Sequence, residues 1–262
     1  MSRVWSVSNV PAMDRDAYLD VLHHEATALL AAARAAEPAG PVPGCPAWTT
    51  TDLVWHIGEI HDFWGYVVRE RSTAPDAYEH PVRPGDGAST ADVFEAAHTF
   101  ASDRAAELHR VLSEADPSTP VWTWTPQKDI AFVLRRMAHE TAAHRVDAEH
   151  AAGHEHRLEA GLAADGVDEF LAFFLPRVAH DAPPLGGSVH LHCTDAEGEW
   201  TVRTGDDGGY VVTRDHAKAD AALRGEAHDL LMALWRREPL DAVTVFGDRH
   251  LAETFLARAS NE

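Results

Sequence analysis

Apolar residues recur every three or four positions over most of the first 180 residues, which is the period of an amphipathic helix. Segments rich in Pro, Gly or Asp interrupt this pattern and end the individual runs. The pattern predicts helices at residues 14–36, 48–71, 90–113, 130–153 and 158–178. Long amphipathic helices joined by such connections bury their apolar faces against one another, so we expect a helical bundle in this part of the chain.

After residue 187 the hydrophobic period changes from that of a helix to that of a strand. Apolar and polar residues alternate in short runs that turn residues separate, at 189–193, 200–202 and 210–212. Such runs predict an antiparallel meander. Two further helices are expected, at residues 226–236 and 248–259, and a short strand at 243–245 lies between them.

The change of period divides the chain into two domains and sets the fold class. We expect a four-helix bundle over residues 1–180 and a smaller α+β domain over residues 187–262, so the fold class is α+β. The segment between them contains Pro183 and Pro184 followed by two glycines, which is typical of a linker. At 262 residues the chain is long enough for one large domain or two ordinary ones.

Composition and charge exclude several classes of protein. The formal net charge of −20 argues against a nucleic-acid partner and against binding to an anionic membrane surface. No segment approaches the roughly 20 apolar residues that cross a bilayer, and the N-terminus does not resemble a secretory signal. The two cysteines, Cys45 and Cys193, lie too far apart in sequence to suggest a disulfide framework. We therefore expect a cytoplasmic protein.

Glu140 and His144 are the strongest candidates for chemistry in the chain. They stand four residues apart in the helix predicted at 130–153, so both side chains leave the same face. Val133 and Met137 share that face, which is therefore apolar. A carboxylate and an imidazole in an apolar face are costly to desolvate unless something pairs with them. A divalent metal ion is one such partner, and a buried Glu–His hydrogen bond is the alternative.

A metal site on this face needs a ligand from another helix. The helix predicted at 48–71 offers two histidines, His56 and His61, and both border its apolar face. Periodicity does not separate them. Most of the eighteen histidines are not expected to be ligands. Those in polar surroundings are expected at the solvent-exposed surface, namely His23, His24, His80, His150, His154, His156 and His250.

Two motifs carry a resemblance that distinguishes these histidines. Residues 45–56, with Trp48 and Thr49, resemble the start motif of the mycothiol-dependent maleylpyruvate isomerase family, part of the DinB-like superfamily of metal-binding helical bundles. In that motif the metal-binding His follows the Trp by eight residues, which is His56 here. Residues 139–149 resemble the second motif, although a Trp is more usual where Val146 stands. Segments within residues 219–248 resemble the small C-terminal domain of the same family.

The resemblance implies a metal site formed by His56, Glu140 and His144, with His61 and His139 nearby or at the surface. Two imidazoles and a carboxylate suit zinc, and three protein ligands leave a fourth position open. Manganese, iron and nickel stay open as alternatives, because ligand type alone does not settle the metal. In the resembled family this position serves mycothiol, a small thiol of actinobacteria that the metal activates as thiolate. The implied function is a metal-dependent mycothiol S-transferase or isomerase acting on a small electrophilic substrate.

Other residues have less specific roles at this stage. Arg224 is the candidate for cofactor binding, because a guanidinium can bind an anionic group in a bidentate manner. The sequence does not choose between it and the arginines near the long loop, Arg69, Arg71 and Arg83. Asp147 is a candidate to orient a ligand imidazole, and a contact at the surface or with the N-terminal arm is the alternative. Both cysteines are expected to be structural, and no catalytic residue is assigned.

Two other functions stay open. One is a metal-dependent enzyme of a specialised biosynthetic pathway that uses the same scaffold without the thiol. The other is a non-catalytic bundle that binds a metal or a ligand. A comparison of mycothiol binding to zinc-loaded protein and to metal-stripped protein separates the mycothiol-dependent enzyme from both of these alternatives.

Overall fold

The computed structural model describes residues 13–85, 87–178, 183–206 and 208–259. Two compact units divide between Arg157 and Leu158. We call residues 14–157 the bundle unit and the residues from Leu158 onward the sheet unit. Within the described ranges, no helix combines the length and the apolar character that a membrane span requires.

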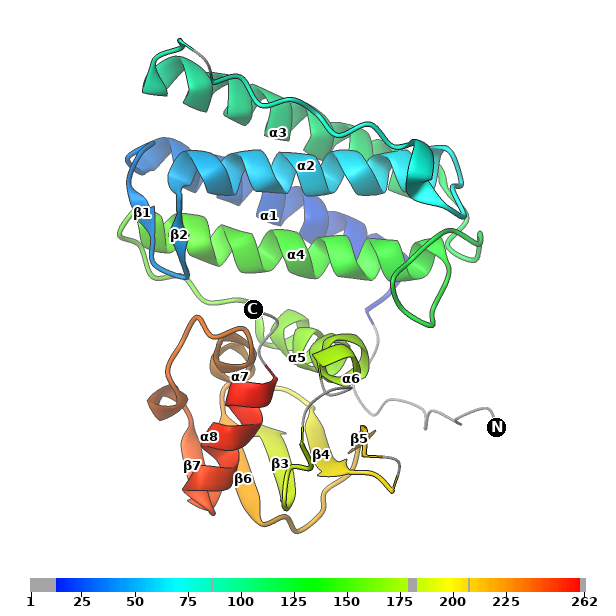
Figure 1. The fold of residues 1–262 in the computed structure, drawn as a ribbon, viewed down its shortest axis with the longest axis vertical. Coiled ribbons are helices and arrows are strands. Elements are labelled where there is room, and N and C mark those ends of the chain that lie inside the picture. The colour runs from blue at the N-terminus through cyan, green and yellow to red at the C-terminus, as the bar shows by residue number, and fades with distance from the viewer. Residues whose placement is uncertain (1–12, 86, 179–182, 207, 260–262) are drawn as a thin grey trace. The chain divides into compact units, whose positions relative to one another are not determined.

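The bundle unit consists of four long helices, which confirms the predicted bundle. Figure 1 shows them side by side, with α1 packed mainly against α4 and α2 against α3. Their bounds are Arg15–Ala35 for α1, Thr50–Arg69 for α2, Thr90–Glu114 for α3 and Ile130–Ala151 for α4. Each helix begins after a residue whose side chain accepts a hydrogen bond from a backbone N–H of the first turn, namely Asp14, Thr49, Ser89 and Asp129.

Helix α4 is buried along most of its length, so its polar side chains need hydrogen-bond or ion-pair partners inside the protein. Arg145 is almost fully buried, and its guanidinium donates to Glu25 at 2.7 Å and to Glu149 at 2.5 Å. A buried arginine without such partners would be strongly destabilising. The pairing links α4 to α1 and holds the register of the two helices.

A short hairpin precedes α2 and was not predicted. Strand β1 (Pro41–Val42) pairs antiparallel with β2 (Cys45–Thr49), and β2 runs directly into α2. The Pro- and Gly-rich segment was expected only to end the first helix, because a two-residue strand has too few positions to display a period. The hairpin matters because it places Trp48 immediately before α2.

The long connection between α2 and α3 contains a short 3-10 helix, η1 (Pro75–Ala77). Tyr78 donates a hydrogen bond to Asp62 on α2 at 2.8 Å, and Arg83 donates to Asp52 at 2.5 Å. These contacts attach the connection to the outer side of α2.

The sheet unit contains five strands in the order β5-β4-β3-β6-β7. Their bounds are Ser188–Cys193 for β3, Glu199–Thr204 for β4, Tyr210–Thr213 for β5, Ala221–Gly225 for β6 and Thr244–Gly247 for β7. Strands β3, β4 and β5 form the predicted antiparallel meander. Strand β6 was not predicted and lies parallel to β3, while β7 is antiparallel to β6. The two alanines of β6 have low strand propensity, so pairing with β3 decides the conformation of β6.

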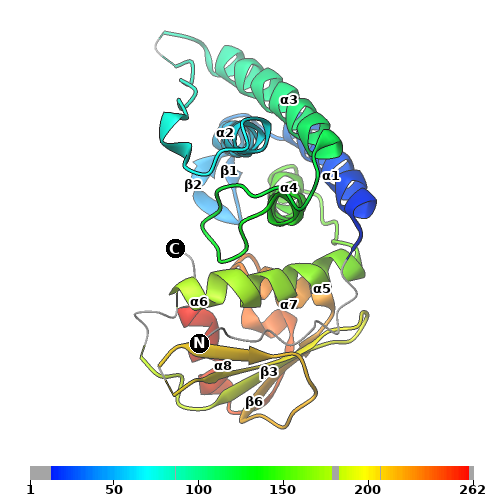
Figure 2. The same cartoon turned by 90° about the vertical axis from the view of Figure 1, so that its right-hand side faces the viewer.

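Helices cover one face of this sheet (Figure 2). They are α5 (Ala160–Glu169), α6 (Leu175–Val178), α7 (Ala227–Leu234) and α8 (Arg249–Arg258), with a π-helical turn, η2 (Phe170–Phe174), between α5 and α6 and a 3-10 turn, η4 (Leu240–Ala242), before β7. Val189, Leu191 and Trp200 are fully buried, and the Trp200 indole donates to Asp168 of α5 at 3.0 Å. Since side chains alternate along a strand, the residues between them on β3 and β4 lie on the other face.

The position of the domain boundary corrects our expectation. The helix predicted at 158–178 was assigned to a bundle domain spanning 1–180, but in the structure it belongs to the sheet unit. The Leu158 amide donates to His228 of α7 at 3.0 Å, and the Phe170 ring lies edge-on to Trp235 at 5.0 Å. Periodicity shows that a helix has a face to bury, but not which partner buries it. Residues 179–182 of the expected linker lie outside the described ranges.

Candidate metal centre

His56, Glu140 and His144 lie together between two helices of the bundle unit. His56 stands in the second turn of α2, and Glu140 and His144 stand one turn apart on α4. The start of α2 is determined by a capping box in which Thr49 and Asp52 exchange hydrogen bonds. The position of His56 relative to the end of the hairpin is therefore set by local sequence.

The three side chains direct their ligand atoms at a common point. Nε2 of His56 lies 3.5 Å from Oε1 of Glu140, and Nε2 of His144 lies 3.3 Å from the same oxygen. All three ligand atoms lie within 4.8 Å of one another. Two atoms bound tetrahedrally to one zinc ion at about 2.0–2.1 Å are about 3.3 Å apart. The donor set and its spacing thus fit a divalent metal ion.

Two buried groups hold the ligands in this arrangement. Nδ1 of His144 is hydrogen-bonded to Asp147 at 2.8 Å, and Asp147 is fully buried. This bond turns Nε2 of His144 toward Glu140, which is the usual way in which a carboxylate orients a metal-binding imidazole. Arg136 donates to Oε2 of Glu140 at 3.0 Å and leaves Oε1 facing the histidines.

The electrostatics of the site favour a cation. Burial raises the pKa of Glu140, but hydrogen bonds from His144 and His56 and the charge of Arg136 outweigh it, so the pKa lies well below its ordinary value. Burial lowers the pKa of His144, but its bonds to Asp147 and Glu140 raise it by more. Two carboxylates around one imidazole stabilise a positive charge at this point, whether a proton or a metal ion carries it.

Trp48 lies against both imidazoles. Its ring centroid is 4.6 Å from that of His56 and 5.8 Å from that of His144. The side chains of His56 and Glu140 are 28% and 21% exposed, so part of each side chain is open to solvent. The site therefore has an aromatic wall, a buried polar support and an accessible side.

Comparison with known proteins identifies the family of the chain. Residues 19–149 match the model of the mycothiol maleylpyruvate isomerase N-terminal domain, and residues 161–254 match the MDMPI C-terminal domain. The chain belongs to the mycothiol maleylpyruvate isomerase family. The two matches lie on either side of the division at Arg157 and Leu158.

Solved structures show the same fold. A crystal structure of the mycothiol-dependent maleylpyruvate isomerase aligns with a TM-score of 0.59 at 13% identity, over 89% of this chain and 93% of that chain. A histidine-to-alanine mutant of that enzyme aligns with a TM-score of 0.57 at 12% identity, over the same shares of the two chains. A search of curated proteins gives no significant match.

His61 and His139, the two other histidines near the candidate site in sequence, are core residues. His61 is 1% exposed, and its Nε2 is hydrogen-bonded to Thr141 of α4 at 2.9 Å. Burial lowers its pKa to about 4. His139 is also buried, and its ring lies edge-on to Tyr18 of α1 at 6.3 Å. Neither residue lies at the surface, which was one of the two positions expected for them.

Cys45 lies closer to the site than the sequence suggested. Its Sγ donates to Oδ2 of Asp147 at 3.7 Å, and Cys45, His144 and Asp147 form a second group of ligand atoms within 4.8 Å. Cys45 thus touches the carboxylate that orients His144. Cys193 lies in the sheet unit, where burial raises its pKa to about 12. That thiol is a poor nucleophile at neutral pH.

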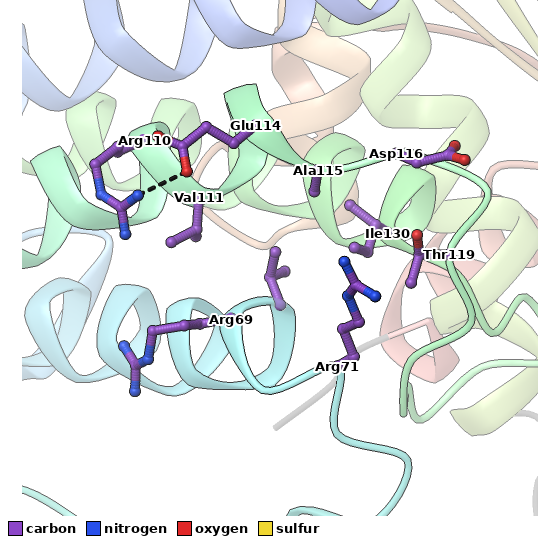
Figure 3. A pocket seen from close by; sticks show the side chains of 10 residues that line it. Arg69, Arg71, Arg110, Val111, Glu114, Ala115, Asp116, Thr119 and Ile130 are labelled. Atoms are coloured by element: carbon purple, nitrogen blue, oxygen red, sulfur yellow. Dashed lines mark hydrogen bonds and ion pairs between the residues drawn. The ribbon is translucent and has the colours of Figure 1, made fainter.

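Two of the arginines near the long loop pair with carboxylates. Arg83 pairs with Asp52, and Arg69 pairs with Glu70 at 2.9 Å. Arg69 and Arg71 line a cavity of about 350 Å³ near the end of α2 and α3, together with Arg110, Glu114 and Asp116 (Figure 3). Arg69 stands thirteen positions after His56 on α2, which is about 20 Å along the helix. This cavity is therefore separate from the three ligands.

Arg224, the candidate for cofactor binding, stands on β6 of the sheet unit and is exposed. Its role in binding stays a prediction.

Proposed function

We propose that the chain is a metal-dependent mycothiol S-transferase or isomerase that acts on a small electrophilic substrate. The observation that carries the proposal is the convergence of His56, Glu140 and His144 in a member of this family, with ligand spacings that fit one metal ion. Three protein ligands leave one position of a tetrahedral ion free for another molecule. Two imidazoles and one carboxylate favour zinc among the common divalent ions.

A divalent ion in this position would lower the pKa of a coordinated thiol and hold it as thiolate, the nucleophilic form. The chain's own residues supply the rest. Asp147 holds Nδ1 of His144, so its other ring nitrogen is available as a ligand. Hydrogen bonds from His144 and His56, together with the charge of Arg136, keep Glu140 ionised. Trp48 covers one side of the imidazoles and limits the access of water there.

Addition of a thiolate accounts for either activity. It forms a C–S bond at an activated double bond and leaves a C–C single bond, about which the substrate can rotate. Elimination of the same thiolate then restores the double bond in the other configuration. Transfer follows instead when the adduct takes up a proton and is released. Both schemes need an external thiol, because Cys45 donates to Asp147 and the Cys193 thiol is buried in the other unit.

Cobalt-substituted protein tests the source of the thiol. We expect a sulfur-to-metal charge-transfer band only after mycothiol is added, and we expect the same behaviour in Cys45→Ser and Cys193→Ser. A band without added thiol that disappears in Cys45→Ser would mean that the chain's own cysteine is the ligand.

Activity with a panel of electrophiles tests the reaction. Turnover should require mycothiol, should disappear in His56→Ala and should survive in both cysteine variants. Full turnover without mycothiol would support a thiol-free enzyme on the same scaffold, and metal binding without any turnover would support a non-catalytic bundle.

A further inference from the structure

Three histidines and one glutamate meet in the sheet unit, far along the chain from the family motifs. His190 and His192 are two residues apart on β3, so their side chains lie on the same face of the sheet. Glu199 is the cross-strand partner of His192 on β4. His216 stands in the connection 214–220 between β5 and β6. We call these four residues the sheet cluster.

Strand order explains how His216 reaches the other three. Strands β5 and β6 are not neighbours, because β4 and β3 lie between them. The connection from β5 to β6 therefore has to cross the sheet. The helices occupy one face, and the cluster is on the face opposite Trp200.

The nitrogens of the cluster surround one carboxylate. Nδ1 of His192 lies 2.5 Å from Oε1 of Glu199, and Nδ1 of His216 lies 2.9 Å from Oε2. Nε2 of His190 lies 3.9 Å from Oε2. One ligand atom from each of the four residues lies within 4.8 Å of the other three.

His190 supplies a separate observation. The residue is only 6% exposed, and its Nε2 is buried without a hydrogen-bond partner among the residues that the structure describes. A buried polar atom without a partner destabilises the folded state, so such atoms call for an explanation. Here the nitrogen is aimed at the side of the carboxylate where the other ligand atoms converge.

We propose that His190, His192, Glu199 and His216 form a second metal site, which binds Zn²⁺ or a similar late transition-metal ion. Three imidazoles and one carboxylate suit zinc, nickel or copper and do not suit magnesium or calcium, which prefer oxygen ligands. Four protein ligands fill a tetrahedral shell, and a filled shell is typical of structural zinc. The ion fastens the connection 214–220 to β3 and β4. This proposal is independent of the proposed function, because it uses none of the same residues.

Arg224 is a cation beside the cluster, since it neighbours His192 on β6. It is exposed, so solvent and salt screen its charge. The competing explanation is a hydrogen-bonded network in which Glu199 alone bridges His192 and His216. That network needs no metal.

The test is a zinc titration of the full chain by calorimetry at micromolar metal. We expect two ions on the unsubstituted protein and one on His56→Ala, which disables the bundle site. In the His56→Ala background, His192→Ala or His216→Ala should lower the remaining affinity by at least about tenfold, in line with the cost of losing metal-site groups. His250→Ala, an exposed histidine of α8 in the same unit, is the matched control and should change nothing.

His216 is 78% exposed in its side chain, so its substitution does not disturb a core, and circular dichroism checks the fold of every variant. Cobalt bound to His56→Ala should show tetrahedral d–d bands without a sulfur band. Folded His56→Ala that binds no zinc, or binds it equally well after His192→Ala and His216→Ala, would overturn the second site. Activity of His192→Ala tells the two proposals apart, because we expect it to equal that of the unsubstituted protein.

Discussion

The bundle site and the sheet cluster use the same side-chain chemistry in opposite ways. In the bundle, the ligands are supported from outside. Asp147 holds His144, and Arg136 holds Glu140. In the sheet cluster, the hydrogen bonds described for the imidazoles run to Glu199 itself. In the bundle site, residues outside the group of candidate ligands position them. In the sheet cluster, the candidate ligands position one another.

The spacing of the atoms reflects this difference. Glu140 stands 3.3 and 3.5 Å from its two histidine nitrogens, which leaves room for an ion between them. Glu199 stands 2.5 and 2.9 Å from its hydrogen-bonded nitrogens, so an ion there has to replace those bonds. A reactive site has to keep its geometry while a substrate exchanges, and this requires supporting groups. A structural site can take its final geometry when the ion binds.

Substitution of a metal-ligand candidate should give the largest difference in activity between the bundle site and the sheet cluster. His144→Ala should lose the bundle metal and reduce activity by at least about a thousandfold, since metal stabilisation of charge is worth several kcal/mol. His192→Ala should keep full activity. Elemental analysis and turnover measure both effects. Unchanged metal content at the bundle site of His144→Ala would remove the basis of the comparison.

A fall in pH should lower the free energy of unfolding through His61. Its folded pKa of about 4 lies below the unfolded value of 6.5, because burial disfavours the charged form. The unfolded chain then binds more protons between these values, so stability is complete above pH 6.5 and is lost as the pH falls toward 4. The loss is about 3 kcal/mol. Urea unfolding of the full chain across this range measures it.

The control for this effect is His61→Gln, which keeps a polar group near Thr141 but does not titrate. Its stability should fall less between pH 6.5 and 4 than that of the unsubstituted protein. Equal slopes in the two proteins would contradict the assignment to His61.

Removal of the support alone should give a smaller effect than removal of a ligand. Asp147→Asn leaves the shape of the side chain but removes the charge that orients His144. We expect zinc affinity and activity to fall by about 10–100-fold, as is usual for such partners. Zinc competition with a chelator measures the affinity, and binding at the sheet cluster serves as the internal control. If the Asp147→Asn protein binds zinc as tightly as the unsubstituted protein, the charge of Asp147 does not position His144.

The smallest effect is expected at Cys45. Its thiol donates a weak hydrogen bond to Asp147, and a hydroxyl can replace it. Cys45→Ser should therefore keep activity within about threefold and lose about 0.5–1.5 kcal/mol of stability at most, the usual contribution of one hydrogen bond. Turnover and thermal unfolding test this. Loss of activity with retained zinc would give Cys45 a chemical role.

Local patterns in the sequence were sufficient for much of this protein. The four bundle helices, their capping residues and the strands β3 to β5 follow from interactions within one or two turns or along one strand. The pairing of Glu140 with His144 is also local, because residues four apart on a helix share a face. Resemblance to the family motifs, rather than periodicity, selected His56.

Tertiary structure decided whatever depends on a distant partner. Packing of α2 on α4 brings His56 to Glu140 and His61 to Thr141, although both histidines border the same apolar face. Helix α5 packs in the sheet unit because its apolar face meets α7, and β6 is a strand because β3 pairs with it. The sheet cluster joins residues from two strands and a crossing connection, and hydrophobic periodicity does not predict that these residues lie together. Periodicity identifies the face that a segment buries, whereas long-range packing determines what that face contacts.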